Sequence, residues 1–399
     1  MSKTDDETYE NTGKMILPSI VISRFATMPP GFLVGLLLID IGDSFEKTVG
    51  VTGQISTAAS IVGVLSALLI SALSLSFNPK SLLVAGLVVL VVSAIGCAFA
   101  PSFYILLTIY AMTGMAGSFV GPMAFTLIAK HFPPNQRANA ISWVITGMSS
   151  ANLIGAPLIG YISSFVGWRG SFLWFVMPIS MLGLFMSIKF IPSKRRPDSG
   201  DHEDKVSIIN SFKKVLRNTS AVSCLAGTAL ITAAYMAMVS YAPSYYREQF
   251  QFSTTQATYV IIGSSFFFIL GTRICGRLVS LFGRKPLILW FTIGASISIF
   301  VYLNVSIIWL SLAARFIGST FSAIVFTVIN ALTLEQVPKY RGTVMSLNQA
   351  TFNLGGVLGT GLGGLIILLL GYDVMGISHG LLMLVAMLIL HFFTKEPED

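Results

Sequence analysis

Charged residues are scarce in this chain, and their scarcity excludes the ordinary soluble classes of protein. Asp, Glu, Lys and Arg make up 11% of the 399 residues, whereas a soluble domain carries about 25%. Only 3 cysteines occur, all within apolar stretches, which excludes a disulfide framework. The 4 histidines do not cluster, and neither a phosphate-binding glycine loop nor a nucleophile with a paired base is present. We therefore expect no enzymatic activity, no metal site and no cofactor.

Long apolar runs are what the sequence has instead. The chain is 54% hydrophobic, with a mean hydropathy of +0.78. A bilayer core about 30 Å thick needs roughly 20 apolar residues in a helix, and lipid offers no partner for open backbone groups, so such runs are helices. The sequence predicts an all-α polytopic membrane protein with twelve spans, at 15–40, 49–76, 81–100, 103–129, 138–165, 169–192, 218–246, 255–281, 285–304, 306–333, 343–371 and 375–394.

The net charge of +8 is distributed unevenly between the predicted loops. With both termini in the cytoplasm, 18 of the 25 Lys and Arg residues lie on the inner side, 3 on the outer side and 4 within spans. This asymmetry is typical of the positive-inside rule and argues against nucleic-acid binding. The acidic start "MSKTDDETYENTGK" lacks the features of a cleavable signal peptide, so we expect the first span to be retained. We expect a multi-pass protein of the plasma membrane.

A basic polar segment after span six divides the chain nearly in half. It contains Pro, Gly and Ser and is predicted to be a cytoplasmic linker with a short amphipathic helix at Val206–Leu216. The expected organisation is a tail at 1–14, a six-helix bundle at 15–192, the linker at 193–217, a second bundle at 218–394 and a tail at 395–399.

The two halves repeat each other in sequence. The stretch beginning "TGMAGSFVGP" at Thr113 aligns with "IGSTFSAIVF" at Ile317, which places Pro134 with Pro338 and Arg137 with Arg341. Both halves hold six spans in the same orientation, so they form a parallel repeat about an axis along the membrane normal. That architecture is typical of transporters, whose substrate site lies near the midplane between the halves.

The loop after span eight reads "GRLVSLFGRKP", and the loop after span two has a degenerate copy, "SALSLSFNPKS". These loops resemble the signature of the major facilitator superfamily of secondary transporters, which is approximately G-x-x-x-D-R-x-G-R-K/R. The resemblance to that family extends over essentially every span. Span five carries Gly155, Pro157 and Gly160, followed by Gly167-Trp168-Arg169, which is similar to the sugar-efflux-like branch of the drug:proton antiporters.

The resemblance implies a gating role for the signature loop of the second half. In the family, the loop cations and the aspartate form a charge-relay latch between neighbouring helices on the cytoplasmic face. Here the aspartate is replaced by Ser280, and by Leu75 in the first copy, so helix-end and lipid contacts remain as the alternative. The gating residues expected from the resemblance are Gly276, Ser280, Gly283, Arg284, Lys285, Gly155, Pro157 and Gly160.

Four arginines within the predicted spans are the strongest functional candidates, because a charge in a membrane is costly and usually marks a cavity. Arg24 is near midplane, and its guanidinium would bind a carboxylate or phosphate in a two-pronged fork, or cap carbonyls near Pro29 and Pro30. Arg315 and Arg273 are assigned coupling or structural roles, and Arg277 lies close enough to the loop glycine to extend its charge to the membrane interface. No Asp or Glu lies well inside a span.

Uncharged polar side chains in spans two, seven and eleven complete the candidate substrate site. They are expected either to line a cavity or to hydrogen-bond between helices. Those proposed to contact substrate, besides Arg24, are Gln54, Tyr235, Tyr241, Asn348 and Asn353.

We expect a monomeric secondary transporter that exports a small organic solute by rocker-switch alternating access, driven by an ion or solute gradient. An organic-anion transporter that uses the arginines is the main alternative. A transporter-derived sensor is less favoured, because the chain has no large soluble domain. The substrate, the direction and the coupling ion are not fixed by the sequence.

Overall fold

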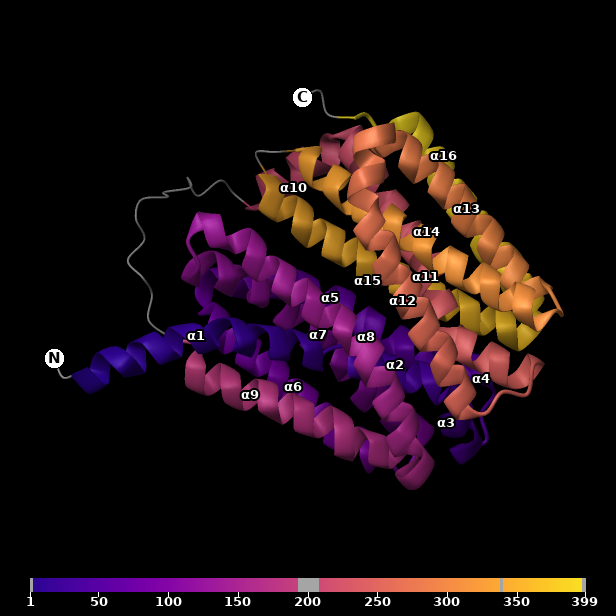
Figure 1. The fold of residues 1–399 in the computed structure, drawn as a ribbon, viewed down its shortest axis with the longest axis horizontal. Helices are drawn as coiled ribbons and strands as arrows, with labels where there is room; N and C mark the ends of the chain where they lie inside the picture. The colour runs from indigo at the N-terminus through magenta and orange to yellow at the C-terminus, as the bar shows by residue number, and fades with distance from the viewer. Residues whose placement is uncertain (1–2, 193–207, 338–339, 397–399) are drawn as a thin grey trace. The chain divides into compact units, whose positions relative to one another are not determined.

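A computed structural model describes residues 3–192, 208–337 and 340–396, and every regular element in these ranges is a helix (Figure 1). The helices of the first half are α1 Lys3–Ala26, α2 Pro29–Leu36, α3 Leu38–Ser44, α4 Val49–Thr52, α5 Gln54–Ser76, α6 Pro79–Ala98, α7 Phe103–His131, α8 Pro134–Ser171, the π-helical turn η1 Phe172–Val176 and α9 Met177–Phe190. Those of the second half are α10 Ile208–Arg217, α11 Thr219–Gln249, α12 Thr254–Phe282, α13 Arg284–Asn304, α14 Ile308–Glu335, α15 Arg341–Leu370 and α16 Tyr372–Phe393.

Eleven helical segments are long and apolar enough to cross a membrane within the described residues. One of them, Trp143–Phe190, is 48 residues long, which is about twice the length of a single crossing. Within this segment Gly167 adopts φ +66°, a left-handed backbone conformation that glycine adopts without steric cost. This residue interrupts the helix between spans five and six. The all-α fold with twelve crossings, predicted from the apolar runs, is thereby confirmed.

The first span is broken at its two prolines, as the sequence predicts. α1 ends at Ala26 and α2 begins at Pro29, since a proline at the start of a helix loses no hydrogen bond there. The free carbonyl of Arg24 accepts bonds from the amide of Thr27 at 3.3 Å and from its hydroxyl at 2.8 Å. This break positions the Arg24 side chain discussed below.

Several long helices begin at side-chain caps that satisfy their free amides. Asn218 accepts from the amide of Ala221 at the start of α11, and Ser253 and Gln256 form a reciprocal capping box at the start of α12. The linker helix α10 forms directly before Asn218 and overlaps all but the first two residues of the segment where the sequence predicts an amphipathic helix. Residues 193–207 of the predicted linker lie outside the described residues.

Contacts divide the chain into two units that do not coincide with the two sequence halves. The first unit holds Met1–Leu33 and Val62–Asp201, and the second holds Val34–Ile61 and His202–Asp399. The end of span one and the start of span two, in α2 to α5, therefore group with the second half. The bundle limits 15–192 and 218–394 remain predictions.

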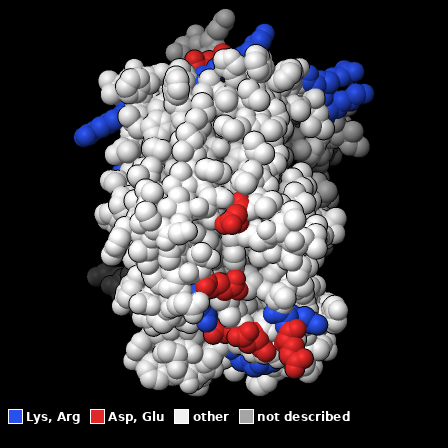
Figure 2. Space-filling view, turned by 90° about the vertical axis from the view of Figure 1, so that its right-hand side faces the viewer, with Lys and Arg blue, Asp and Glu red and all other residues white. Residues whose placement is uncertain are grey.

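The surface is apolar where a membrane protein requires it. Large hydrophobic side chains are exposed along many helices, among them Trp174, Trp290 and Trp309. Uncharged residues cover most of the face in Figure 2, and charged residues collect in a few groups. A soluble monomer rarely exposes apolar patches of this extent, so the lipid bilayer is the solvent that fits this surface.

Candidate functional site

The sequence-predicted site residues are divided between the two units. Arg24 and the span-five residues Gly155, Pro157 and Gly160 belong to the first unit. The second unit holds Gln54, Tyr235, Tyr241, Asn348, Asn353, Arg273, Arg315 and the signature loop.

Arg24 is buried in the first unit and forms no ion pair with any Asp or Glu that the structure describes. Its side chain is 9% exposed, and Nη1 donates to the hydroxyl of Thr27 at 3.3 Å. The Nε atom has no hydrogen-bond partner among the described residues. A Cβ on Gly121 of α7 would lie 3.3 Å from Nη1, so the guanidinium rests directly against that glycine. The Nε–H group of Arg24 is therefore a buried donor that can bind a hydrogen-bond acceptor.

The segment 34–61 packs on α11 and α15 through glycines. A Cβ on Gly50 would overlap the carbonyl oxygen of Gly364, and a Cβ on Gly53 would overlap the ring of Tyr241. Along α15, Gly355 and Gly359 lie in the same way against backbone carbonyls of α11. Glycine is required at Gly50 because any side chain would separate the two backbones.

Hydrogen bonds join the same elements. Gln54 Nε2 donates to the carbonyls of Gly50 at 3.4 Å and Gly361 at 3.3 Å. The hydroxyls of Thr57 and Thr360 are 3.0 Å apart, and Tyr241 Oη donates to the carbonyl of Thr360 at 2.7 Å. Two of the predicted substrate ligands, Gln54 and Tyr241, therefore use their polar atoms on backbone carbonyls.

An ion pair ties the same segment to the end of α11. Arg247 donates to both carboxylate oxygens of Asp40, through Nη1 to Oδ2 and through Nη2 to Oδ1 at 3.2 Å. Both residues lie near the ends of their helices. The distribution of Lys and Arg predicts that these ends face away from the cytoplasm. We call the whole contact set the clamp: Asp40, Gly50, Gln54 and Thr57 of segment 34–61, with Tyr241, Arg247, Thr360, Gly361 and Gly364 of α11 and α15.

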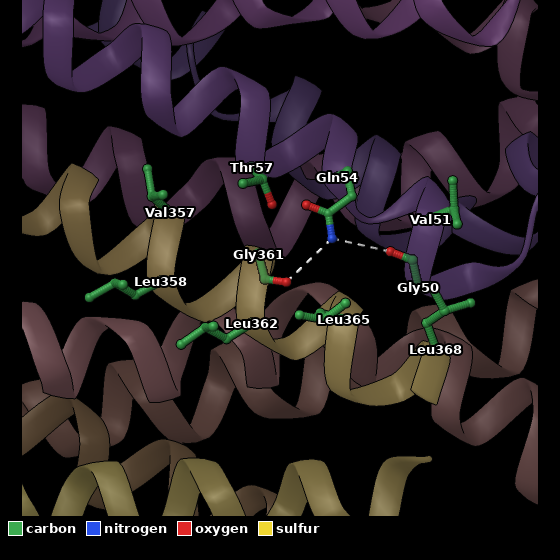
Figure 3. Close-up of a pocket in the computed structure, with 10 residues that line it drawn as sticks. All are labelled: Gly50, Val51, Gln54, Thr57, Val357, Leu358, Gly361, Leu362, Leu365 and Leu368. Carbon is green, nitrogen blue, oxygen red and sulfur yellow. Dashed lines mark hydrogen bonds between the residues drawn. The ribbon is translucent and has the colours of Figure 1, made fainter. Parts of the chain in front are cut away.

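A pocket of about 470 Å³ lies beside the clamp, between α4–α5 and α15 (Figure 3). Its polar lining comes from Gln54 and Thr57, and in Figure 3 the Gln54 amide points toward Gly361 and Gly50. The rest is apolar and includes Leu362, Leu365 and Leu368, which are 42%, 48% and 45% exposed. The pocket could accept an apolar group.

Tyr235 lies in a group of aromatic rings contributed by α11, α12, α14 and α15. Its ring centroid is 5.6 Å from that of Phe268 and 5.1 Å from that of Phe326, which in turn is 6.3 Å from Phe352. Such a surface suits a small organic solute with a flat apolar face.

The remaining polar candidates of α15 are bonded to each other or to α14. Asn348 Nδ2 donates to Asn330 Oδ1 at 2.6 Å, and the Asn348 Oδ1 atom has no partner among the described residues. Gln349 Nε2 lies 3.5 Å from Asn353 Oδ1. The sequence reasoning missed Asn330, although its spacing in span ten could have suggested a polar partner for span eleven.

The two arginines assigned coupling or structural roles differ in environment. Arg273 on α12 is exposed, whereas Arg315 on α14 is only 4% exposed. No ion pair forms at either residue with any described carboxylate. A group of three or more metal-binding side chains is likewise absent from the described part of the chain.

Comparison with known proteins identifies the family. The family model of the Major Facilitator Superfamily matches residues 20–279 and, in a second match, 224–399. The chain belongs to the major facilitator superfamily. The resemblance of its loops and span five is thus confirmed at the level of the superfamily, whose members are transporters and generally not enzymes.

Relatives span almost the whole chain. A probable sugar efflux transporter of Helicobacter pylori strain P12 is 23% identical over 393 residues, covering 97% of each protein. The uncharacterised MFS-type transporter YwfA of Bacillus subtilis is 22% identical over 380 residues, covering 94% of this chain and 90% of the relative. The crystal structure of a D-xylose–proton symporter superposes with a TM-score of 0.79 at 16% identity, over 96% of this chain and 98% of that one.

The superfamily loop of the second half is held by two other segments of the second unit. Gly283, with φ +77°, forms the turn between α12 and α13. Arg284 pairs with Glu335 at the end of α14, and Lys285 Nζ donates to the carbonyl of Thr394 at 2.7 Å. The loop cation therefore has a carboxylate partner although the motif aspartate is missing.

The other motif positions make weaker contacts. Ser280 Oγ donates to the carbonyl of Arg277 at 2.8 Å within its own helix, and a Cβ on Gly276 would meet nothing within 4 Å. On α8, a Cβ on Gly155 would touch Phe175 at an ordinary 3.7 Å. Pro157 and Gly160 lie on the same helix. Their gating role stays a prediction.

Proposed function

We propose that this superfamily member is a secondary active transporter that exports a small organic solute by rocker-switch alternating access. The clamp carries the proposal. In the clamp, residues 34–61, which form the end of span one and the start of span two, group with the second half of the sequence. They pack there against α11 and α15, which are spans seven and eleven. Such a contact must separate when a carrier opens to the predicted outer side.

The chemistry of the clamp supports a contact that opens and closes. Glycine backbones form much of it, the Gln54 bonds are long at 3.3 and 3.4 Å, and the Asp40 and Arg247 side chains are 36% and 14% exposed. Water can replace each of these polar contacts at little cost. The closed and open states of the clamp therefore differ little in free energy. A ligand can shift the equilibrium between two such states.

The aromatic group around Tyr235 and the free amide oxygen of Asn348 are the proposed solute contacts in the second unit. Both come from helices that the parallel repeat predicts to face the midplane cavity. Gln54 and Tyr241 are assigned to the clamp and not to the solute contacts, because their polar atoms form hydrogen bonds within the clamp. Export as the direction, and a sugar-like solute, are supported by the name of the Helicobacter relative.

The test is counterflow in proteoliposomes. Purified protein is screened by thermal shift against sugars, apolar drugs and carboxylates, and each stabilising solute is then loaded inside vesicles. A carrier accumulates labelled external solute transiently against its gradient, without ATP. Flux that does not saturate would indicate a channel, and binding without flux would indicate a sensor; either result overturns the proposal.

A second candidate is transport of an organic anion, favoured by the free Nε of buried Arg24. A carboxylate or phosphate can receive two parallel bonds from a guanidinium, which neutralises the buried charge at the same time.

Arg24→Ala tests this candidate. Losing a buried charge-paired partner costs about 2–5 kcal/mol, which is a weakening of anion binding by about 30-fold or more. Arg24→Lys keeps the charge but not the fork, so it should recover only part of the affinity. Arg273→Ala, which removes an exposed intramembrane arginine, is the matched control. Unchanged anion affinity in a folded Arg24→Ala protein would refute the candidate.

A further inference from the structure

A second buried arginine, which belongs to neither the clamp nor the aromatic group, forms no ion pair with a described carboxylate. Arg315 lies in the first third of α14, and its Nε and Nη1 atoms have no hydrogen-bond partner among the described residues. Its guanidinium lies over the ring of Tyr302 on α13, with the guanidinium carbon 5.7 Å from the ring centroid. An isolated charge in a low-dielectric interior costs several kcal/mol.

Neighbouring hydroxyls make the surroundings of Arg315 rich in donors. Tyr302 is fully buried, and its Oη atom likewise has no partner in the described part of the chain. Ser311 Oγ donates to the Tyr302 carbonyl at 2.7 Å, so in its 3.0 Å contact with Tyr246 the serine oxygen accepts and the tyrosine donates. Tyr246 is therefore satisfied, while the Tyr302 hydroxyl stays available as a donor.

We propose that Arg315 and Tyr302 hold a small inorganic anion, chloride in the cell, inside the second unit. Two guanidinium nitrogens and one hydroxyl, on two side chains in contact with each other, have no partner among the described residues. An anion is the partner that can accept from these donors and also neutralise the charge. Water would accept the bonds but leave the charge unpaired. The site does not depend on the proposed transport function.

Chloride binding to the purified full chain tests the proposal directly. Equilibrium dialysis with radioactive chloride in a gluconate buffer should show saturable binding of about one ion per chain, displaced by bromide. A hydrogen bond to a charged group contributes about 1.5–3 kcal/mol, so Tyr302→Phe should weaken binding by about 10- to 150-fold. Arg315→Gln should abolish the binding.

Two controls make the test specific. Arg273→Gln removes an exposed arginine, and Tyr161→Phe removes the hydroxyl of an exposed tyrosine on α8; both should bind chloride as the wild type does. Absence of saturable binding in the wild type would overturn the proposal. Unchanged binding in Tyr302→Phe would overturn it even if Arg315→Gln did not fold. Loss of the ion in Arg24→Gln, with binding unaffected in the Arg315 and Tyr302 variants, would also overturn it.

Discussion

Gly50 is the position where a single methyl group should reveal whether the clamp opens. A Cβ there would overlap the Gly364 carbonyl oxygen and would lie 2.9 Å from Leu368 Cβ and 3.0 Å from Leu368 N. Backbone atoms cannot rotate away from the methyl group, so Gly50→Ala must push α4 from α15. In the open state of the proposed cycle this neighbour is absent and alanine fits.

The expected magnitude follows from overpacking. An extra methyl group in a close-packed contact costs about 1–3 kcal/mol. Alanine also favours a helix over glycine by about 1 kcal/mol, but this gain is the same in both states and cancels from the equilibrium between them. With 1.4 kcal/mol for each factor of ten, the open population should rise by about 5- to 140-fold.

Cysteine labelling measures that population. Thr57→Cys introduces a reporter at a clamp position that is 8% exposed, in otherwise wild-type and Gly50→Ala proteins. The native Cys97, Cys224 and Cys275 are all buried, so the background is low. When closing is fast compared with labelling, the rate for a membrane-impermeant maleimide follows the open fraction.

Gly117→Ala on α7 is the control, because a Cβ there would meet nothing within 4 Å. It gains the same helix propensity without a collision, so its labelling rate should equal that of the parent. A rise of less than about twofold in Gly50→Ala would refute the reasoning. So would an equal rise in both variants.

Three further predictions address the ion pair, the coupling and the topology. Asp40→Asn should raise the labelling rate of Thr57→Cys by about two- to fivefold, because a partly exposed ion pair contributes up to about 1 kcal/mol. Arg247→Lys should have a smaller effect. No change in either variant would show that the ion pair does not contribute to the clamp. Transport of a solute with fixed charge should depend little on a pH gradient, since no carboxylate lies well inside a span, and a strong dependence would point to Asp40 or Glu335. Lys213→Cys and Arg284→Cys should react with reagent from the same side of the membrane, and labelling from opposite sides would contradict the twelve-span topology.

Local sequence signals predicted the elements of the fold well. Each apolar run is long enough to cross a bilayer, and the pair Pro29–Pro30 marks the break in the first span. The repeat and the loop around Gly283 indicated the superfamily, and the family model confirms it. The burial of Arg24 is consistent with its predicted place in the membrane.

The partners of the candidate residues could not be predicted in the same way. The sequence shows Asp40, Arg247, Arg284 and Glu335 as separate charges near span ends, with nothing to say that they form two pairs. The close approach of Gly50 to Gly364 joins residues more than 300 positions apart. The degenerate motif suggested that the Arg284 latch had lost its carboxylate, yet Glu335 supplies one from another helix.

The sequence by itself determined that this protein is a chain of membrane-crossing helices in two repeated halves, because a bilayer forces each span to satisfy its own backbone locally. Only the tertiary structure decided which polar groups are paired and which stay free. Apolar helices can pack in many arrangements of similar hydropathy, and the one adopted depends on side chains meeting across large sequence separations. Hence the clamp, the orphan donors of Arg24 and Arg315 and the pairing of Arg284 appear only in the folded protein.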